Sequence, residues 1–346
     1  MKTVPLLAHD GDLIAEAARP GLGAAAWWAS WGAHCREGPD SSLRELGAAG
    51  DGHGPKSGEA AVPSPATSSP MGELALHIGQ RGGRSVAIHQ FHQGALRVLR
   101  PHYLDDSGQV CYVVVNPGGA YLGADLFLVD VAVGDGADLL LTTQSATKIY
   151  RTPGSFAEQR MTVRLGEGAR LELMPDQLIA YRQASYRQNT YISVRPSSSL
   201  VMAEVVTPGW SPDGASFRYE ELRLRNEIRV ETDDGGQLLA LDNLLIRPPA
   251  GDVTGLGHME GFSHLGSLVV VDARVDQSLA DDLHSVTADH EAHAGISLTR
   301  TLAGTTGLVL RSLSDSTGEL NRLLGACTAL LRERWHGQAP LDLRKY

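Results

Sequence analysis

Apolar residues recur at every second position in short runs from about residue 73 to residue 311, and Gly, Pro, Asp or Ser separates the runs. This alternation is typical of β-strands, and the breaks are typical of turns. The stretch 116–151 shows the pattern most clearly. It contains a Pro-Gly-Gly turn, a long apolar run, a Gly-Asp-Gly break, a second apolar run and a polar patch. The pattern predicts a strand, a tight turn, a second strand and then a loop.

An internal repeat extends this prediction. Residues 131–141 recur as 163–173 with an offset of 32 residues, and looser copies occupy 192–202 and 228–238. Each copy reads as a strand, a turn and a strand, and glycine at the turn supplies the positive φ that hairpins require. Hairpins that cannot bury a face alone must stack on their neighbours. The repeat predicts an all-β fold, a stacked, helix-like or solenoidal arrangement of antiparallel strands.

The two ends of the chain differ from this body. Residues 314–334 carry leucines at helical spacing, with Ser314 or Ser316 as a possible cap and Gly337 just beyond, which predicts a C-terminal amphipathic helix. Residues 1–70 are rich in Ala, Gly, Pro and Ser, a composition typical of a disordered leader. Three tryptophans in the leader leave a docking patch open as an alternative. The folded β domain is expected at 72–346.

Composition excludes several classes of function. The net charge is −10, so the chain is not expected to bind nucleic acid. Its three cysteines are far apart and odd in number, which favours a reducing compartment over a disulfide framework. The N-terminus is a poor signal peptide, and the sequence lacks the run of about 20 apolar residues that a membrane helix needs. We therefore expect a cytoplasmic protein.

Enzymatic signatures are also missing from the sequence. It contains no GxxxxGK[ST], HExxH, GxSxG or CxxC motif. His290 and His293 lie three residues apart and could share a helix face, but without further fixed ligands they indicate a metal site only weakly. The sequence thus carries none of the enzyme signatures that these motifs represent.

Four carboxylates lie within or beside apolar strands: Asp125, Glu172, Glu204 and Asp242. A buried carboxylate is costly unless it is paired, hydrogen-bonded or in contact with water. They therefore indicate either a polar interior passage or, more simply, solvent-facing positions on their strands. Asn226 also lies on the otherwise apolar face of its strand.

The longest motif is NPGGxxxGxDxxxxDVxVGxGAxxLLTTxxATKxYR, followed by LELMPDQLIAYRQA. It resembles the urease accessory protein UreD (also called UreH) family over residues 72–346. The most specific segment contributes family-motif or partner-contact candidates, and Glu172 joins them from the second motif: Thr142, Thr143, Thr147, Lys148, Tyr150, Arg151 and Glu172. Ala124 departs from the pattern, which usually has glycine before the acidic residue.

The resemblance implies an accessory function, and it implies that the chain is not an enzyme. Members are scaffold chaperones that bind the urease apoprotein and the accessory protein UreF, which recruits the GTPase UreG, and they take part in two-fold assemblies. They support insertion of nickel into urease and hold no cofactor tightly. A water-filled passage for Ni²⁺ in transit is expected within the β-fold. Asp125, Glu204 and Asp242 fall at acidic positions of the family and are the candidate passage residues.

Two other hypotheses stay open. The histidines and carboxylates are also compatible with a nickel-storing or nickel-sequestering protein. A β-solenoid hydrolase is the third, although the acidic residues do not cluster as such an enzyme would require.

Overall fold

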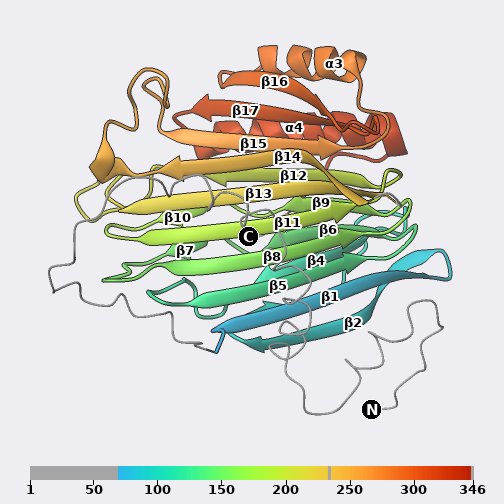
Figure 1. The fold of residues 1–346 in the computed structure, drawn as a ribbon, viewed down its shortest axis with the longest axis horizontal. Helices are drawn as coiled ribbons and strands as arrows, with labels where there is room; N and C mark the ends of the chain where they lie inside the picture. The colour runs from blue at the N-terminus through green and yellow to red at the C-terminus, as the bar shows by residue number, and fades with distance from the viewer. Residues whose placement is uncertain (1–68, 233–234, 344–346) are drawn as a thin grey trace, which may run out of the picture. The chain divides into compact units, whose positions relative to one another are not determined.

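Two β-sheets lie face to face in the computed structural model, which describes residues 69–232 and 235–343 (Figure 1). The first, seven-stranded over these residues, has the order β14 (Gly235–Ile246), β13 (Glu221–Thr232), β11 (Ser185–Val194), β8 (Ala157–Leu165), β5 (Leu126–Val133), β1 (Gly72–Arg81) and β2 (Arg84–Gly94). The leader prediction for residues 1–70 falls, apart from 69 and 70, outside the described residues.

The second sheet is ten-stranded over the same residues. Its main path is β16 (His293–Arg300), β17 (Thr306–Ser314), β15 (His264–Val271), β12 (Ser199–Val206), β9 (Arg170–Met174), β6 (Asp138–Thr143), β4 (Val110–Val115) and β3 (Arg97–Val98). Two short strands, β7 (Thr147–Ile149) and β10 (Leu178–Ala180), pair beside this path, and β10 also pairs with β12. A short 3₁₀ helix, η3 (Pro248–Ala250), follows β14.

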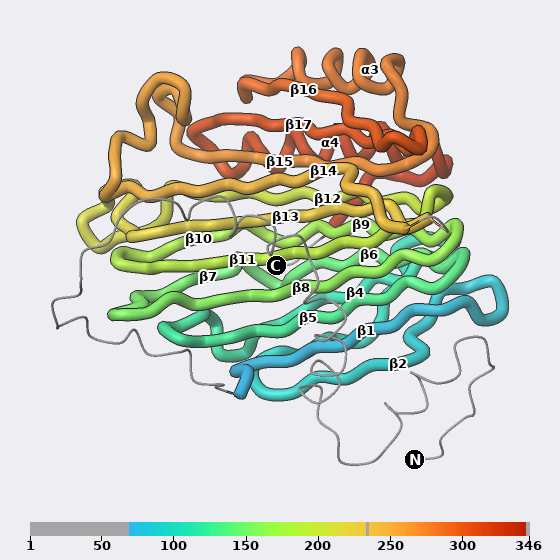
Figure 2. The backbone as a smooth tube through the Cα atoms, in the orientation of Figure 1, coloured from blue at the N-terminus to red at the C-terminus, as the bar shows by residue number. Residues whose placement is uncertain are grey.

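The chain passes from one sheet to the other and back as it winds along the stack (Figure 2). Each of the first three repeats is a strand of the seven-stranded sheet, an arch, and a strand of the ten-stranded sheet. Equivalent strands of successive repeats pair in parallel, β5 with β8 and β8 with β11 in one sheet, and β6 with β9 and β9 with β12 in the other. The predicted stacked, solenoid-like β-fold is confirmed.

The prediction that these repeats are antiparallel hairpins is wrong in its detail. Alternation and a glycine turn are common to a hairpin and to an arch between two sheets, so the sequence pattern does not separate them. The fourth repeat is a true antiparallel pair, β13 with β14. Antiparallel pairing is otherwise found toward the ends of both sheets, as between β1 and β2 and between β15 and β17.

Close packing of the arches explains their glycines. Gly136 and Gly168 adopt left-handed φ values of 63°. Gly166 has no room for a side chain, because a Cβ atom there would lie 2.3 Å from Oδ1 of Asp135 in the preceding arch. That oxygen instead accepts a hydrogen bond from the backbone N–H of Glu167 at 2.8 Å. The arches are therefore held to one another by this side-chain-to-backbone hydrogen bond as well as by the sheets.

Two apolar layers hold the body together. Leu76, Val131, Val163 and Ile192 represent the layer between the sheets, where all four are almost fully buried. The second layer lies between the outer face of the ten-stranded sheet and the helices α3 (Gln277–Ala288) and α4 (Thr317–His336). At about 25 cal/mol per Å² of apolar surface, such layers are the main source of folding free energy.

The predicted C-terminal helix is confirmed as α4. The Ser316 side chain accepts a hydrogen bond from the backbone N–H of Glu319, and Gly337 ends the helix at a φ of 61°. Helix α3 was not predicted. The expected helix face for His290 and His293 is wrong, because α3 ends before Asp289 and His293 begins β16.

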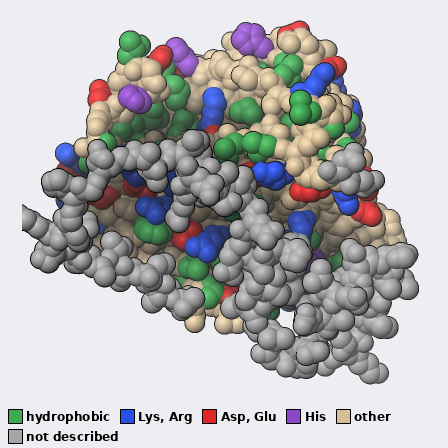
Figure 3. Space-filling model, in the orientation of Figure 1, with side chains coloured by type: hydrophobic (Ala, Val, Ile, Leu, Met, Phe, Trp, Pro, Cys, Tyr) green, Lys and Arg blue, Asp and Glu red, His purple; other side chains and the backbone are tan. Residues whose placement is uncertain are grey.

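The outer face of the seven-stranded sheet is charged. Arg225 and Arg229 both pair with Glu227 along β13, at 2.6 and 2.7 Å. In Figure 3, Lys and Arg side chains lie next to Asp and Glu across the uncovered middle of the view. The other face of β13 is buried, and it carries Leu222, Leu224, Asn226, Ile228 and Val230.

Candidate functional site

The layer between the sheets changes from apolar to polar along the strands. Strand β11 directs Tyr186, Ile192 and Val194 into the apolar core, but the interior positions between them are Gln188 and Thr190. Thr190 is paired in register with Asn226 of β13, and Asn226 in turn with Asp242 of β14. A row of polar side chains therefore crosses the interior of the seven-stranded sheet.

Glu204 of β12 faces this row from the opposite sheet. Its two carboxylate oxygens accept hydrogen bonds from Nε2 of Gln188 and from Nδ2 of Asn226, both at 2.6 Å. Burial raises the pKa of the Glu204 carboxyl above its usual range, the two amide donors lower it, and the nearby Asp242 raises it further. Glu204 is thus a carboxylate kept in the interior by two neutral donors, with no cation bound directly to it among the described residues.

Asp242 lies at the more open end of the same row. Nη2 of Arg311 on β17 donates to Oδ1 of Asp242, so an ion pair joins the two sheets there. The side chains of Arg311 and Asp242 are 35% and 18% exposed. Glu204, in contrast, is hydrogen-bonded to side chains between the two sheets. Asp242 is therefore accessible from solvent, and Glu204 lies behind it.

A cavity of about 90 Å³ lies beside Glu204 between the sheets. Its polar lining combines residues of both sheets with the predicted motif segment: Tyr121, Thr142, Thr143, Thr147, Gln159, Asp176, Gln188, Thr190 and Glu204. A volume of this size exceeds what a single water molecule needs, and the polar groups on its mostly apolar walls offer water hydrogen-bond partners. The structure thus brings three of the predicted motif threonines to the same interior space as Glu204.

Two unpaired polar atoms support a hydrated interior. Oδ1 of Asn226 and Oγ of Ser267 are buried and have no hydrogen-bond partner within the described part of the chain. Ser267 is directly opposite Glu204 in the pairing of β15 with β12. Because an unsatisfied buried polar atom costs about 1–3 kcal/mol, water is the natural partner for both atoms.

Asp125 is placed differently from the other two passage candidates. It lies just before β5, and its Oδ2 accepts the backbone N–H of Leu122 at 2.7 Å. Asp125 is not among the cavity-lining residues; its charge adds to the burial that raises the pKa of the Tyr121 hydroxyl, which does line the cavity. The preceding residue, Ala124, adopts a φ of 66°, which explains why the family pattern usually has glycine there.

The remaining motif residues face outward. Thr147 and Ile149 point inward from the short strand β7, so Lys148 and Tyr150 lie on its outer side. Tyr150 is 42% exposed, and Arg151 beside it is also exposed. The motif thus serves two surfaces, a cavity wall and an outer strip.

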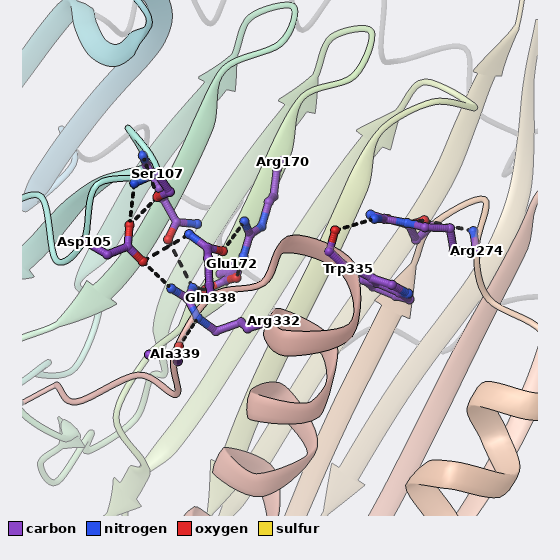
Figure 4. Close-up of polar contacts among 11 residues, drawn as sticks. Asp105, Ser107, Arg170, Glu172, Arg274, Arg332, Trp335, Gln338 and Ala339 are labelled. Atoms are coloured by element: carbon purple, nitrogen blue, oxygen red, sulfur yellow. Dashed lines mark hydrogen bonds and ion pairs between the residues drawn. The ribbon is translucent and has the colours of Figure 1, made fainter.

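Glu172 belongs to a separate buried cluster (Figure 4). On β9, its carboxylate accepts hydrogen bonds from Arg170 and from Nη1 of Arg332 on α4, and it is 1% exposed. Gln338, beyond the helix, accepts from Nη1 of Arg170 at 2.6 Å and donates to Asp105 at 3.2 Å. This cluster fixes α4 and the following segment to the ten-stranded sheet.

The described residues contain no group of three or more His, Cys, Asp or Glu side chains arranged to hold a metal ion. Glu204 and Asp242 come into one network, but amide donors and a guanidinium occupy the positions around them. No helix in the described ranges has the length and apolar character needed to cross a membrane.

Comparison with known proteins identifies the family. The model of the UreD urease accessory protein family matches residues 71–345. The chain belongs to this family. The predicted resemblance is therefore confirmed over nearly the whole described body, and the three passage candidates, Asp125, Glu204 and Asp242, lie within the matched range.

Individual relatives agree with the family match. The chain is 81% identical over 280 residues to the urease accessory protein UreD of Arthrobacter sp. (strain FB24), an alignment covering 81% of this chain and 96% of that protein. It is 48% identical over 359 aligned positions to UreD of Kocuria rhizophila, covering 88% and 99% of the two chains. UreD of Bacillus cereus is 33% identical over 279 residues, covering 80% and 99%. The family and these relatives are named as accessory proteins and not as enzymes.

Sequence reasoning missed several members of the interior network. Gln188, Ser267 and Arg311 carry no signal of their own, because polar residues at alternate strand positions usually face solvent. Asn226 did carry one, since it interrupts an otherwise apolar face. The antiparallel pairing of β12 with β15 and of β15 with β17 brings Ser267 and Arg311 into line with Glu204, and Gln188 reaches Glu204 from the facing sheet.

Proposed function

We propose that this chain is a scaffold chaperone for nickel insertion into apo-urease, and that it passes Ni²⁺ through its interior without holding the ion tightly. The observation that carries the proposal is the polar network between the sheets, in which Asn226 donates to Glu204 and is paired in register with Asp242, and Glu204 lines the cavity. Membership of the UreD family gives the setting in which such a path is useful.

The chemistry of the network suits transit. Carboxylate, amide and hydroxyl oxygens are hard donors that bind divalent cations through water as well as directly. Glu204 offers one carboxylate, and its amide neighbours direct N–H groups toward it. A nickel ion passing Glu204 would keep most of its water shell and leave readily. Asp242, the more exposed carboxylate, would meet the ion at one end of the path.

The scaffold function requires partners. We propose that the chain binds the urease apoprotein and a UreF-like accessory protein, that a UreG-like GTPase joins through the latter, and that the complex has two-fold symmetry. We place this complex in the cytoplasm. The charged outer face of the seven-stranded sheet and the exposed side of the motif segment supply surface for such contacts.

Gene deletion tests the proposal directly. We expect urease purified from a deletion strain to lack nickel, as measured by elemental analysis, and complementation with the full chain to restore it. An undiminished nickel content in the deletion strain would overturn the proposal. Calorimetry of the isolated protein with Ni²⁺ tests the storage alternative, which requires tight stoichiometric binding at sub-micromolar nickel; transit predicts weak binding.

A further inference from the structure

Successive coils of the fold place large side chains in one row on the outside of β7 and β10. Tyr150 and Tyr181 lie with their ring centroids 4.7 Å apart, and Tyr181 and Trp210 are 4.9 Å apart. Both spacings match the distance between neighbouring strands. Backbone pairing explains the row, because Tyr181 bridges Trp210 and β7 pairs in parallel with β10.

The row continues to an earlier coil. Tyr121 bridges Ile149, so the residues that follow them, Leu122 and Tyr150, lie side by side in strand register. Leu122, Tyr150 and Trp210 are 51%, 42% and 51% exposed. We call Leu122, Tyr150, Tyr181 and Trp210 the aromatic strip. Isolated exposed apolar residues need no explanation, but a continuous row of them indicates a contact surface.

Cations accompany the strip. Lys148 lies on the same side of β7 as Tyr150, and Arg151 and Arg182 directly follow Tyr150 and Tyr181. Among residues 69–232 and 235–343, no carboxylate forms an ion pair with any of these three side chains. Asp213, in the loop after Trp210, accepts hydrogen bonds from the Ser211 hydroxyl and the Ala215 N–H and forms an ion pair with Arg218. Three cations without an ion-pair partner among the described residues thus adjoin the strip, in a chain of net charge −10.

We propose that the aromatic strip docks an acidic amphipathic helix of a protein partner in the maturation complex. The cations beside the strip favour carboxylates on the partner, and the aromatic rings favour apolar side chains on it. The strip presents one large side chain about every 5 Å, so its partner should present apolar side chains at a similar spacing. A helix does so once per turn, because it rises about 5.4 Å per turn. The inference rests on the proposed function for the identity of the complex, but the strip itself follows from the fold.

Crosslinking at both ends of the strip tests the proposal. The photoreactive residue p-benzoylphenylalanine replaces Leu122 in one full-length variant and Trp210 in another, and each is assembled with the urease apoprotein and the accessory proteins of its host. Three strand spacings separate the two positions, about 14 Å. We expect both crosslinks in one acidic peptide of a partner, about ten residues apart, because a helix rises about 1.5 Å per residue.

Other outcomes of the crosslinking would overturn the proposal. Crosslinks about four residues apart would indicate an extended segment, which rises about 3.3 Å per residue. A neutral or basic partner peptide, a second copy of this chain, residues 1–68 of the same chain, or no crosslink in the assembled complex would each contradict it. Leu302, which is fully exposed in another loop, is the control position and is expected to give no crosslink to that peptide.

Charge reversal provides the second test. Lys148→Glu, Arg151→Glu and Arg182→Glu together are expected to weaken capture of the partner at least tenfold, with the thermal midpoint of the isolated variant close to that of the wild type. Arg81→Glu with Arg300→Glu is the matched control, because both arginines are exposed and distant in sequence from the strip. Equal loss in both variants, or none in the triple variant, would contradict the proposal.

The two proposals can fail separately. If the triple variant binds its partners and supports nickel insertion normally, while gene deletion still abolishes insertion, the docking inference fails and the scaffold function stands. If deletion leaves nickel insertion intact, the scaffold function fails irrespective of the strip.

Discussion

Arg332, near the end of helix α4, donates a hydrogen bond at 2.5 Å to the carboxylate of Glu172 on strand β9, 160 positions earlier in the chain. Both side chains are almost fully buried, at 2% and 1% exposure. Arg170 holds the other oxygen of the same carboxylate. The C-terminal helix is thus attached to the solenoid by a buried ionic cluster as well as by its apolar face.

Removing Arg332 should therefore destabilise the whole fold. Arg332→Ala leaves Glu172 buried with Arg170 as its one remaining cationic partner, and breaking a buried pair costs about 3–5 kcal/mol. We expect urea denaturation to show a loss of unfolding free energy near the lower end of this range, because Arg170 still pairs with Glu172. Replacing both partners, with Glu172→Gln and Arg332→Met, should recover part of it.

Arg322→Ala on the same helix is the control. Arg322 pairs with Glu319 but its side chain is 68% exposed, so we expect a change of less than about 1 kcal/mol. Equal losses for the two arginine variants would show that the buried cluster adds nothing beyond a surface ion pair.

Local signals were sufficient for much of the fold. The strands, the repeat and the capped helix α4 follow from alternation, glycine turns and the Ser316 and Gly337 signals. The arches were misread as hairpins because the turn chemistry is the same, and the choice between them depends on contacts about 30 residues away. Helix α3 was missed because its polar face leaves few apolar positions, with Leu279 and Leu283 as its main buried leucines.

The candidate site was predictable only in part. Glu204 and Asp242 stood out because each interrupts an apolar strand. Their connection through Asn226 depends on the register between β13 and β14, which a sequence without its fold does not specify. Glu172 gave the same signal and lies instead in the cluster beneath α4. Its expected part in partner contact, like the passage itself, stays a prediction.

Ala124 gives a prediction about local strain. A left-handed φ costs a residue with a Cβ roughly 1–2 kcal/mol, and glycine avoids this cost. Ala124→Gly should raise stability by about 0.5–1 kcal/mol, since glycine also increases the entropy of the unfolded chain. Thermal denaturation measures the change. Ala132→Gly, near the end of β5 and without a positive φ, should lower stability; a lower midpoint for both variants would contradict the strain at Ala124.

Glu204 should lower the stability of the fold at neutral pH and support nickel delivery. The folded-state pKa of its carboxyl lies above the usual 4.5, so the folded protein binds this proton more tightly than the unfolded chain does. Its contribution to stability is therefore full at low pH and declines as the pH rises through the raised pKa. Glu204→Gln should stabilise the protein at neutral pH, on the order of 1 kcal/mol, a shift of about 2–4 °C in the thermal midpoint. Asn226 can accommodate the new amide by turning its unpaired Oδ1 toward it.

The advantage of Glu204→Gln should shrink below pH 4.5, where the wild-type carboxyl is protonated in both states. The same variant should deliver less nickel to urease at neutral pH, because it has lost the interior carboxylate. Thr190→Ser, a conservative change in the same interior row, is the control for both measurements. A variant that is more stable but fully competent in nickel delivery would separate Glu204 from the passage.

Arg311 should compete with nickel for Asp242. The guanidinium occupies Oδ1 of Asp242 at the more open end of the interior path, so a divalent cation must displace it or share the carboxylate. Arg311→Met removes the competing charge and keeps an unbranched side chain. We expect Ni²⁺ to bind the isolated variant roughly five- to tenfold more tightly in calorimetry at pH 8, which corresponds to about 1–1.4 kcal/mol.

Adding Asp242→Asn should abolish the gain, whereas Arg300→Met, at the end of β16, should leave nickel affinity unchanged. If Arg311→Met binds nickel no better than the wild type, Asp242 does not receive the ion, and the path through the interior must begin elsewhere.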